Sequence, residues 1–227
     1  MLSRRQKALF YAFASPMMRI SGTAYRRFGA PREGQIRVHL GPGQTKYLPS
    51  WINVDANMFT GKCDVWADLR NPLPFRPGTV KAMYSHHVVE HLPDLRLHFK
   101  EAMRCLSPGG IYRVAGPNGD AAIRKFVDED LAWFTDWPDE RRSIGGRLDN
   151  FIFCRAEHVT ILTRSFLTEL MEEVGFTNIA ARLPVRDTGY PELFDDAMRT
   201  EAEDDYDWPH TLILEGEKPS PSSVLLR

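Results

Sequence analysis

From residue 36 onward, short apolar runs alternate with stretches in which apolar residues recur every three or four positions. The short runs predict β-strands and the periodic stretches predict amphipathic helices. Strands are predicted at 36–40, 51–55, 63–68, 80–85, 111–115, 178–185 and 211–215. Helices are predicted within 88–106 and at 165–174, and the acidic residues 192–207 are predicted to form an exposed loop. This alternation favours a parallel α/β sheet, and two final strands joined by a loop favour an antiparallel edge.

Residues 1–32 are predicted to form a helical extension ahead of a domain at 33–227. Large apolar residues recur in it at helical spacing: Phe10, Phe13, Met17 and Ile20. Pro16 lies inside this pattern and is expected to break or kink the helix. Seven of the chain's 29 basic residues, and none of its 30 acidic residues, lie in the extension. Three interpretations stay open: a lid packed on the domain, a helix that contacts a membrane surface or an anionic polymer, and a frayed tail.

The composition limits the classes of protein to which the chain can belong. With 227 residues, of which 43% are hydrophobic, the chain can bury one sizeable core. The acidic excess on the main body disfavours a nucleic-acid interface there. The three cysteines lie far apart without C-x-x-C spacing, which indicates reduced intracellular thiols. Residues 116–160 interleave aromatic and charged side chains and are predicted to be an insertion that covers the active face.

A glycine turn follows the first predicted strand. Gly41 and Gly43 stand directly after 36–40, and Asp55 ends the next strand. Glycines let the backbone approach a ligand closely, and a carboxylate at a strand tip can hold a ribose diol. The pair predicts a nucleoside-containing cofactor at the carboxyl edge of a parallel sheet. The G-x-G-x-x-G motif of dinucleotide-binding proteins requires a third glycine at position 46, where this chain has Lys46. This argues against a binding site for the pyrophosphate of a dinucleotide.

These residues, with three later stretches, resemble the class I S-adenosylmethionine-dependent methyltransferases, particularly the methyltransferase type 11 group. The resemblance is carried by 40–43 with 51–55, by 65–69 with 72–75, by 84–92 and by 104–110. It implies a three-layer, doubly wound, mostly parallel seven-stranded sheet with an antiparallel edge strand, the Rossmann-like methyltransferase fold. It also implies S-adenosyl-L-methionine as the cofactor.

The same resemblance implies which residues bind the cofactor. These are Gly41, Gly43, Asp55, Asp68, Leu69, Ser85 and His86. The glycines would lie against the methionine part, Asp55 would take the ribose hydroxyls and Asp68 would accept from the adenine amino group. Leu69 would lie against the adenine ring, and Ser85 and His86 would contact the methionine end through backbone or side chain.

His87, Glu90 and His91 formally match the H-x-x-E-H motif of some metalloproteases. In a methyltransferase the same residues begin a helix beside the sulfonium pocket, where His87 or His91 could act as general base. A third interpretation is that Glu90 and His91 only hold the shape of the loop. His158 is expected either at the substrate opening or on an exposed loop.

The expected reaction is methyl transfer to an oxygen or nitrogen of a small-molecule or carbohydrate-type acceptor, without a metal. No Asn/Asp-Pro-Pro-Tyr/Phe element of nucleic-acid amino-methylating enzymes occurs in the chain. We expect the protein in the cytoplasm, with the basic helix at the inner face of a membrane if it contacts lipid. Two other functions stay open: a non-catalytic, cofactor-binding subunit, and a metal hydrolase using His87, Glu90 and His91.

Overall fold

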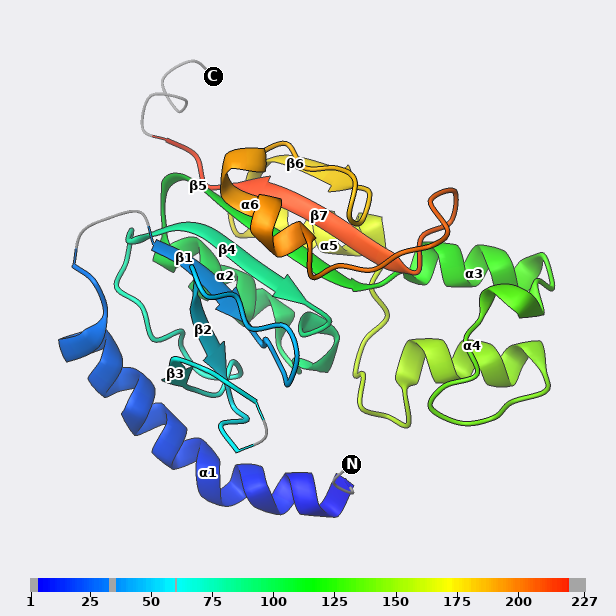
Figure 1. The fold of residues 1–227 in the computed structure, drawn as a ribbon, viewed down its shortest axis with the longest axis horizontal. Helices are drawn as coiled ribbons and strands as arrows, with labels where there is room; N and C mark the ends of the chain where they lie inside the picture. Colours follow the sequence, from blue (N-terminus) through cyan, green and yellow to red (C-terminus); the bar gives the residue numbers. More distant parts are fainter. Residues whose placement is uncertain (1–3, 33–35, 60, 221–227) are drawn as a thin grey trace.

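The computed structural model describes residues 4–32, 36–59 and 61–220, which contain a seven-stranded sheet in the order β3-β2-β1-β4-β5-β7-β6 (Figure 1). The strands are β1 Ile36–Leu40, β2 Ile52–Asp55, β3 Val65–Trp66, β4 Val80–His86, β5 Leu106–Pro117, β6 Thr177–Arg182 and β7 Thr211–Glu217. Strands β1 to β5 pair in parallel, and β7 pairs antiparallel with both β5 and β6. The predicted fold class is confirmed, and the antiparallel pairing lies on the β6–β7 side of the sheet.

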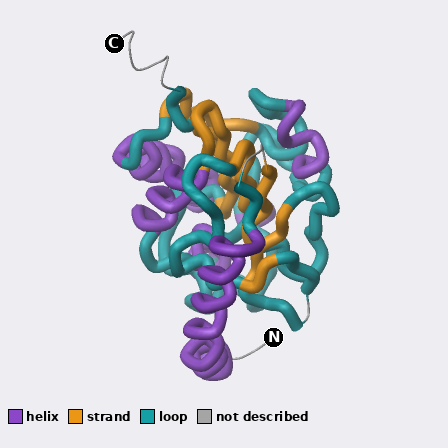
Figure 2. The backbone as a smooth tube through the Cα atoms, turned by 90° about the vertical axis from the view of Figure 1, so that its left-hand side faces the viewer, coloured by secondary structure: helices purple, strands orange, loops and turns teal. Residues whose placement is uncertain are grey.

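Helices flank the sheet, which lies in the middle of the molecule in Figure 2. They are α1 Arg4–Ala24, α2 Leu95–Cys105, α3 Gly119–Val127, α4 Ile144–Phe153, α5 Arg164–Glu173 and α6 Pro191–Met198. Helices α2 and α5 contribute Phe99 and Leu167 to the main core, whereas α6 packs Phe194 against Trp51 and Tyr84 in a second core. Helix α1 contacts the short strand β3 at one end of the sheet.

The prediction of an exposed acidic loop at 192–207 was wrong. Its first part is α6, and Glu201, beyond the helix, is buried. The carboxylate of Glu201 accepts from Nε and Nη2 of Arg113 on β5, both at 2.9 Å. Arg113 also donates to Glu215 on β7 at 2.6 Å. A buried guanidinium therefore holds this acidic segment against the sheet, because an unpaired buried charge would be strongly unfavourable.

Helix α1 forms as predicted, but it runs through Pro16 without a break. Pro16 and Ala12 are exposed, so water can satisfy the carbonyl group that the proline leaves without a helical partner. The predicted apolar stripe faces outward: Phe13 is 77% exposed, Met17 59% and Ile20 70%. Small or flexible side chains on the opposite side, Ala14 and Met18, are buried instead.

Residues 116–160 contain α3 and α4, which extend beyond the carboxyl end of β5 (Figure 1). They share a small apolar cluster of Ala121, Ala122, Trp133, Phe134 and Ile152. Among the described residues, no helix is long and apolar enough to span a membrane.

Candidate active site

The turn after β1 lies against segments that follow β2 and β4. Gly41 and Gly43 have φ of 68° and 59°, the left-handed region that favours glycine. A Cβ on Gly41 would overlap a methyl group of Val88, which follows β4. At Gly43, by contrast, no atom of the described residues lies within 4 Å of the position a Cβ would take. The backbone at Gly43 therefore borders open space, as a ligand that packs against the turn requires.

Asp55 lies directly beside this turn. Its Oδ2 accepts from the Gly43 amide at 2.9 Å, and its Oδ1 accepts from the Asn57 amide at 2.8 Å. These amides orient the carboxylate, and each oxygen keeps a second lone pair for a ligand hydroxyl. The turn and the carboxylate, predicted from separate parts of the sequence, thus form one structure that suits a ribose diol.

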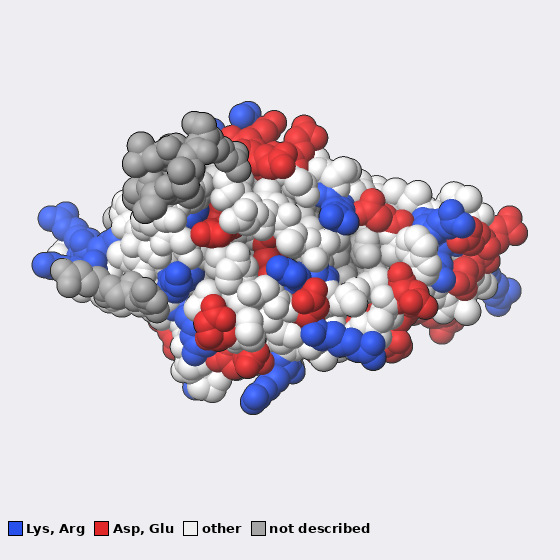
Figure 3. Space-filling model, turned by 90° about the horizontal axis from the view of Figure 1, so that it is seen from above, with Lys and Arg blue, Asp and Glu red and all other residues white. Residues whose placement is uncertain are grey.

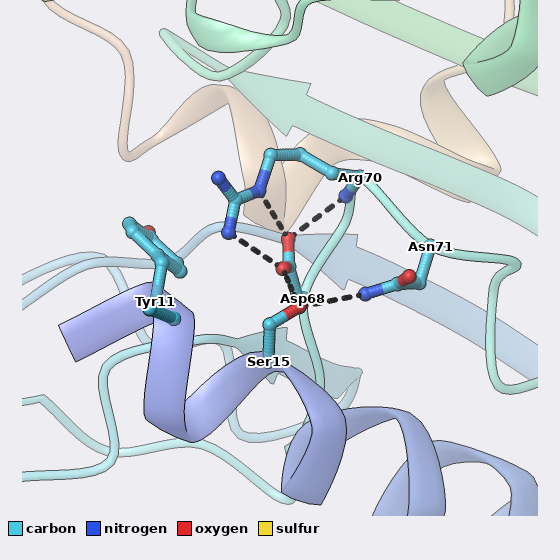
Figure 4. Close-up of a pocket in the computed structure, with 6 residues that line it drawn as sticks. Tyr11, Ser15, Asp68, Arg70 and Asn71 are labelled. Carbon is cyan, nitrogen blue, oxygen red and sulfur yellow. Dashed lines mark hydrogen bonds and ion pairs between the residues drawn. The ribbon is translucent and has the colours of Figure 1, made fainter. Parts of the chain in front are cut away.

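Asp68 is surrounded by donors from its own chain (Figure 4). Arg70 donates from Nε to Oδ1 at 2.9 Å and from Nη2 to Oδ2 at 2.7 Å, and Ser15 of α1 donates to Oδ2 at 2.7 Å. Burial alone would raise the pKa of Asp68, but these hydrogen bonds and the Arg70 charge lower it below its usual range. The Arg70 guanidinium lies 3.8 Å from the ring centroid of Tyr11.

This arrangement bears on the predicted adenine contact. Asp68, Arg70, Ser15 and Tyr11 line a pocket of about 550 Å³. The Asp68 carboxylate accepts four hydrogen bonds there, including one from the Arg70 amide at 3.0 Å, so it is not an open acceptor for an amino group. Leu69 packs on the main core. Ser15 and Tyr11 come from α1, more than fifty residues earlier, and no local sequence pattern pointed to them.

Ser85 and His86 point to opposite faces of the sheet, as successive strand residues must. The Ser85 side chain is buried on the α2 side, where its Oγ lies 2.9 Å from the hydroxyl of Tyr112. Strand alternation turns this side chain into the core, so of the two predicted modes of contact with the cofactor only the one through the Ser85 backbone suits this geometry. His86 lies at the end of β4, with Nδ1 2.9 Å from Nζ of Lys46. Burial, with nearby positive groups, lowers the pKa of His86 to about 2.

Glu90 is the centre of a histidine cluster in the turn Val89–His91. Its side chain is 1% exposed, and its Oε1 lies 3.2 Å from Nδ1 of His87. Nε2 of His91 lies 3.9 Å from the same oxygen, and Nε2 of His158 lies 4.0 Å from it. Burial alone would raise the pKa of Glu90, but the His87 hydrogen bond and the neighbouring histidines lower it. The structure thus adds His158, 67 residues beyond His91, to the predicted motif.

Comparisons with known proteins agree with this geometry. Residues 53–114 match the model of a family described as "Methyltransferase domain". No curated protein matches the chain. A solved S-adenosylmethionine-dependent methyltransferase of Thermotoga maritima, described as a possible histamine N-methyltransferase, is 15% identical with a TM-score of 0.54, and the match covers 93% of this chain and 95% of that one.

A second similar structure is phosphoethanolamine N-methyltransferase 2 of Haemonchus contortus in complex with phosphomonomethylethanolamine and S-adenosylhomocysteine. It is 14% identical with a TM-score of 0.51, and the match covers 86% of this chain but 51% of that enzyme. The chain thus has the fold of solved S-adenosylmethionine-dependent methyltransferases, and its residues 53–114 match the methyltransferase-domain family.

Proposed function

We propose that the chain transfers the methyl group of S-adenosylmethionine to an oxygen or nitrogen of a small-molecule or carbohydrate-type acceptor. The observation that carries the proposal is the contact of Gly43 with Asp55 beside a loop rich in histidine. The cofactor supplies an activated methyl group, so the chain's own residues need mainly to align the acceptor with it. On the face drawn in Figure 3, acidic and basic side chains are interspersed, which supports an acceptor other than nucleic acid.

Cofactor binding is testable without knowing the acceptor. In a titration with S-adenosylhomocysteine, Asp55→Ala should weaken binding at least tenfold, because one or two charge-assisted hydrogen bonds of about 1.5–3 kcal/mol each are lost. Asp55→Asn is the matched control, since its amide oxygen can still accept from Gly43. Equal affinity of Asp55→Ala and the wild type would contradict the proposed ribose site.

For the base, we favour His87 over His91. The His87 side chain is 41% exposed, and Nδ1 can donate to Glu90, so the lone pair is on Nε2, which lies 3.5 Å from the Thr211 hydroxyl and can accept a proton. The Nδ1 of His91 instead faces the backbone carbonyl of Glu157 at 2.9 Å. His87→Gln should lower kcat by about 10²–10⁴-fold while the affinity for S-adenosylhomocysteine stays unchanged.

A methyl-transfer assay on a broad panel of acceptors distinguishes an active methyltransferase from a non-catalytic, cofactor-binding subunit. Transfer to an alcohol, sugar or amine would support the proposed reaction and identify the acceptor atom. Tight cofactor binding without transfer to any member would favour a non-catalytic subunit.

We also propose that α3 and α4, beyond the carboxyl end of β5, cover the bound acceptor.

The outward stripe of α1 supports contact with an anionic membrane surface. Phe13, Met17 and Ile20 are exposed on a helix whose flanking charges are all basic, the combination that an interfacial helix uses. The wild type should sediment with vesicles containing phosphatidylglycerol, and the double variant Phe13→Gln/Ile20→Gln should not. Val127→Gln, which changes an equally exposed apolar residue on α3, is the control. Equal sedimentation of all three proteins would contradict the membrane contact.

A further inference from the structure

The histidine cluster around Glu90 contains three metal-ligand atoms that converge. Glu90, His91 and His158 each offer one ligand atom, and these three atoms all lie within 4.8 Å of one another. An ion bound tetrahedrally at about 2.0–2.1 Å would separate its ligand atoms by roughly 3.3 Å. The carboxylate–imidazole distances of 3.9 and 4.0 Å would therefore have to shorten by only about 0.6 Å, which side-chain rotation can supply.

Both imidazoles are oriented for this role by backbone carbonyls. Nδ1 of His91 lies 2.9 Å from the carbonyl oxygen of Glu157, and Nδ1 of His158 lies 2.9 Å from that of Ile152. A carbonyl oxygen only accepts, so each Nδ1 carries the proton and each Nε2 keeps its lone pair toward Glu90. Metal-binding histidines in proteins are typically held by this kind of hydrogen bond from the second ring nitrogen.

The charge of Glu90 is the second, independent observation. Among the described residues, the basic side chains within 4.0 Å of its carboxylate are three histidines, with no lysine or arginine. Its Oε2 is buried and has no hydrogen-bond partner in the described part of the chain. A buried carboxylate is strongly unfavourable without a compensating cation.

We propose that Glu90, His91 and His158 bind a divalent transition-metal ion such as Zn²⁺. Two imidazole nitrogens and one carboxylate oxygen suit this class of ion, and three protein ligands leave at least one coordination position open. His87, which contacts Glu90 but stands outside the ligand set, keeps its role as proton acceptor.

The ion also bears on the acceptor, and this step rests on the proposed function. An acceptor hydroxyl at the open position would have a lowered pKa. Its proton would pass to Nε2 of His87, its oxygen would bond to the methyl carbon, and the carbon–sulfur bond would break to leave S-adenosylhomocysteine. The site therefore favours an oxygen acceptor, such as the hydroxyl group of a carbohydrate.

Titration of the full chain with the metal alone tests the site. Protein stripped with a chelator should bind one Zn²⁺ per chain by calorimetry, and Co²⁺ should give the visible absorption of a protein-bound ion. His158→Gln and His91→Gln should each weaken Zn²⁺ binding at least tenfold. The control is His210→Gln, because His210, Glu203 and Asp204 form the other candidate group in the described residues.

The outcomes separate the two proposals. Zn²⁺ binding that is unchanged in the double variant His91→Gln/His158→Gln, or lost only in His210→Gln, would overturn the metal site. Absence of stoichiometric binding to the wild type would do the same. S-adenosylhomocysteine affinity, measured on each protein, shows that the variants are folded. It also tests the methyltransferase site independently, since failure of the metal site leaves that affinity intact.

Discussion

Two buried carboxylates lie at the carboxyl edge of the sheet, Asp68 after β3 and Glu90 after β4, and the chain compensates their charges differently. Asp68 is held by a guanidinium and a hydroxyl, with the Arg70 contacts at 2.7 and 2.9 Å. Glu90 is surrounded by three imidazoles, the nearest at 3.2 Å, and its second oxygen has no partner among the described residues.

Asp68 therefore belongs to a permanent ion pair, whereas the charge balance around Glu90 is variable. A guanidinium is always protonated at physiological pH, so the Asp68 pair exists without any ligand. An imidazole is neutral or charged depending on its surroundings, so the charge balance of Glu90 changes with a proton or a metal ion. We infer that Asp68 serves mainly to fasten α1 to the domain, whereas Glu90 serves the reaction.

The largest expected effect follows from the Glu90 side. Glu90→Gln should lower methyl transfer by about 10²–10⁴-fold, because it removes the carboxylate that orients His87 and contributes to the metal site. The measurement is kcat on the acceptor that the panel identifies, with S-adenosylhomocysteine affinity as the folding control. Glu172→Gln, at an exposed position on α5, is the matched charge control. Equal kcat in both variants would place Glu90 outside the reaction.

A buried histidine that is hydrogen-bonded to a neutral amide, His39, sharpens the comparison. His39 has its Nδ1 3.2 Å from Oδ1 of Asn53, and burial lowers its pKa to about 4 from 6.5. The unfolded chain therefore binds the extra proton first as pH falls. Stability is complete above pH 6.5 and is lost as pH falls from 6.5 toward 4.

For His39 the loss between pH 7 and 5 should be about 2 kcal/mol in the free energy of unfolding, measured with urea. His39→Phe should show a smaller loss over that interval, since the phenyl ring can keep the tilted ring contact with Tyr84 and cannot titrate. The Asp68 pair should contribute in a lower window, because its carboxyl pKa lies below 3.8. Identical pH slopes in the variant and the wild type would contradict the assignment to His39.

The ion pair itself is tested by Arg70→Leu. This change should destabilise the chain by about 1–2 kcal/mol, a value reduced by screening because the Arg70 side chain is 36% exposed. Asp68→Asn added to Arg70→Leu should restore part of the loss, as it removes the uncompensated charge. If Asp68 accepts from adenine, Arg70→Leu should leave S-adenosylhomocysteine binding unchanged or tighter. Weaker binding would instead indicate that Arg70 contacts the cofactor.

The smallest expected effect concerns the attachment of α1. Ser15→Ala removes a hydrogen bond to Asp68 at 2.7 Å and a longer one from Asn71 at 3.3 Å, and the free energy of unfolding should fall by about 0.5–1.5 kcal/mol. Ala12→Ser, on an exposed part of the same helix, is the control. A loss much larger than this range would mean that Ser15 stabilises the structure by more than its hydrogen bonds with Asp68 and Asn71.

Local pattern was sufficient for most of the fold. The strands at 36–40 and 80–85 were predictable because they are short apolar runs bounded by turns, and burial in the sheet does not alter that preference. Helix α6 was not predictable from its acidic sequence. Its carboxylate at Asp196 accepts from the Trp51 indole at 3.0 Å, and such long-range pairing overrides the tendency of a charge run to stay solvated.

The sequence by itself determined that Gly41, Gly43 and Asp55 lie together, because they stand at strand ends whose positions follow from the parallel sheet. The tertiary structure alone decided which groups surround each buried charge. Ser15 reaches Asp68, and His158 reaches Glu90, from segments far away in the chain. The physical reason is that a strand end follows from local periodicity, whereas the partner of a buried carboxylate depends on how distant elements pack.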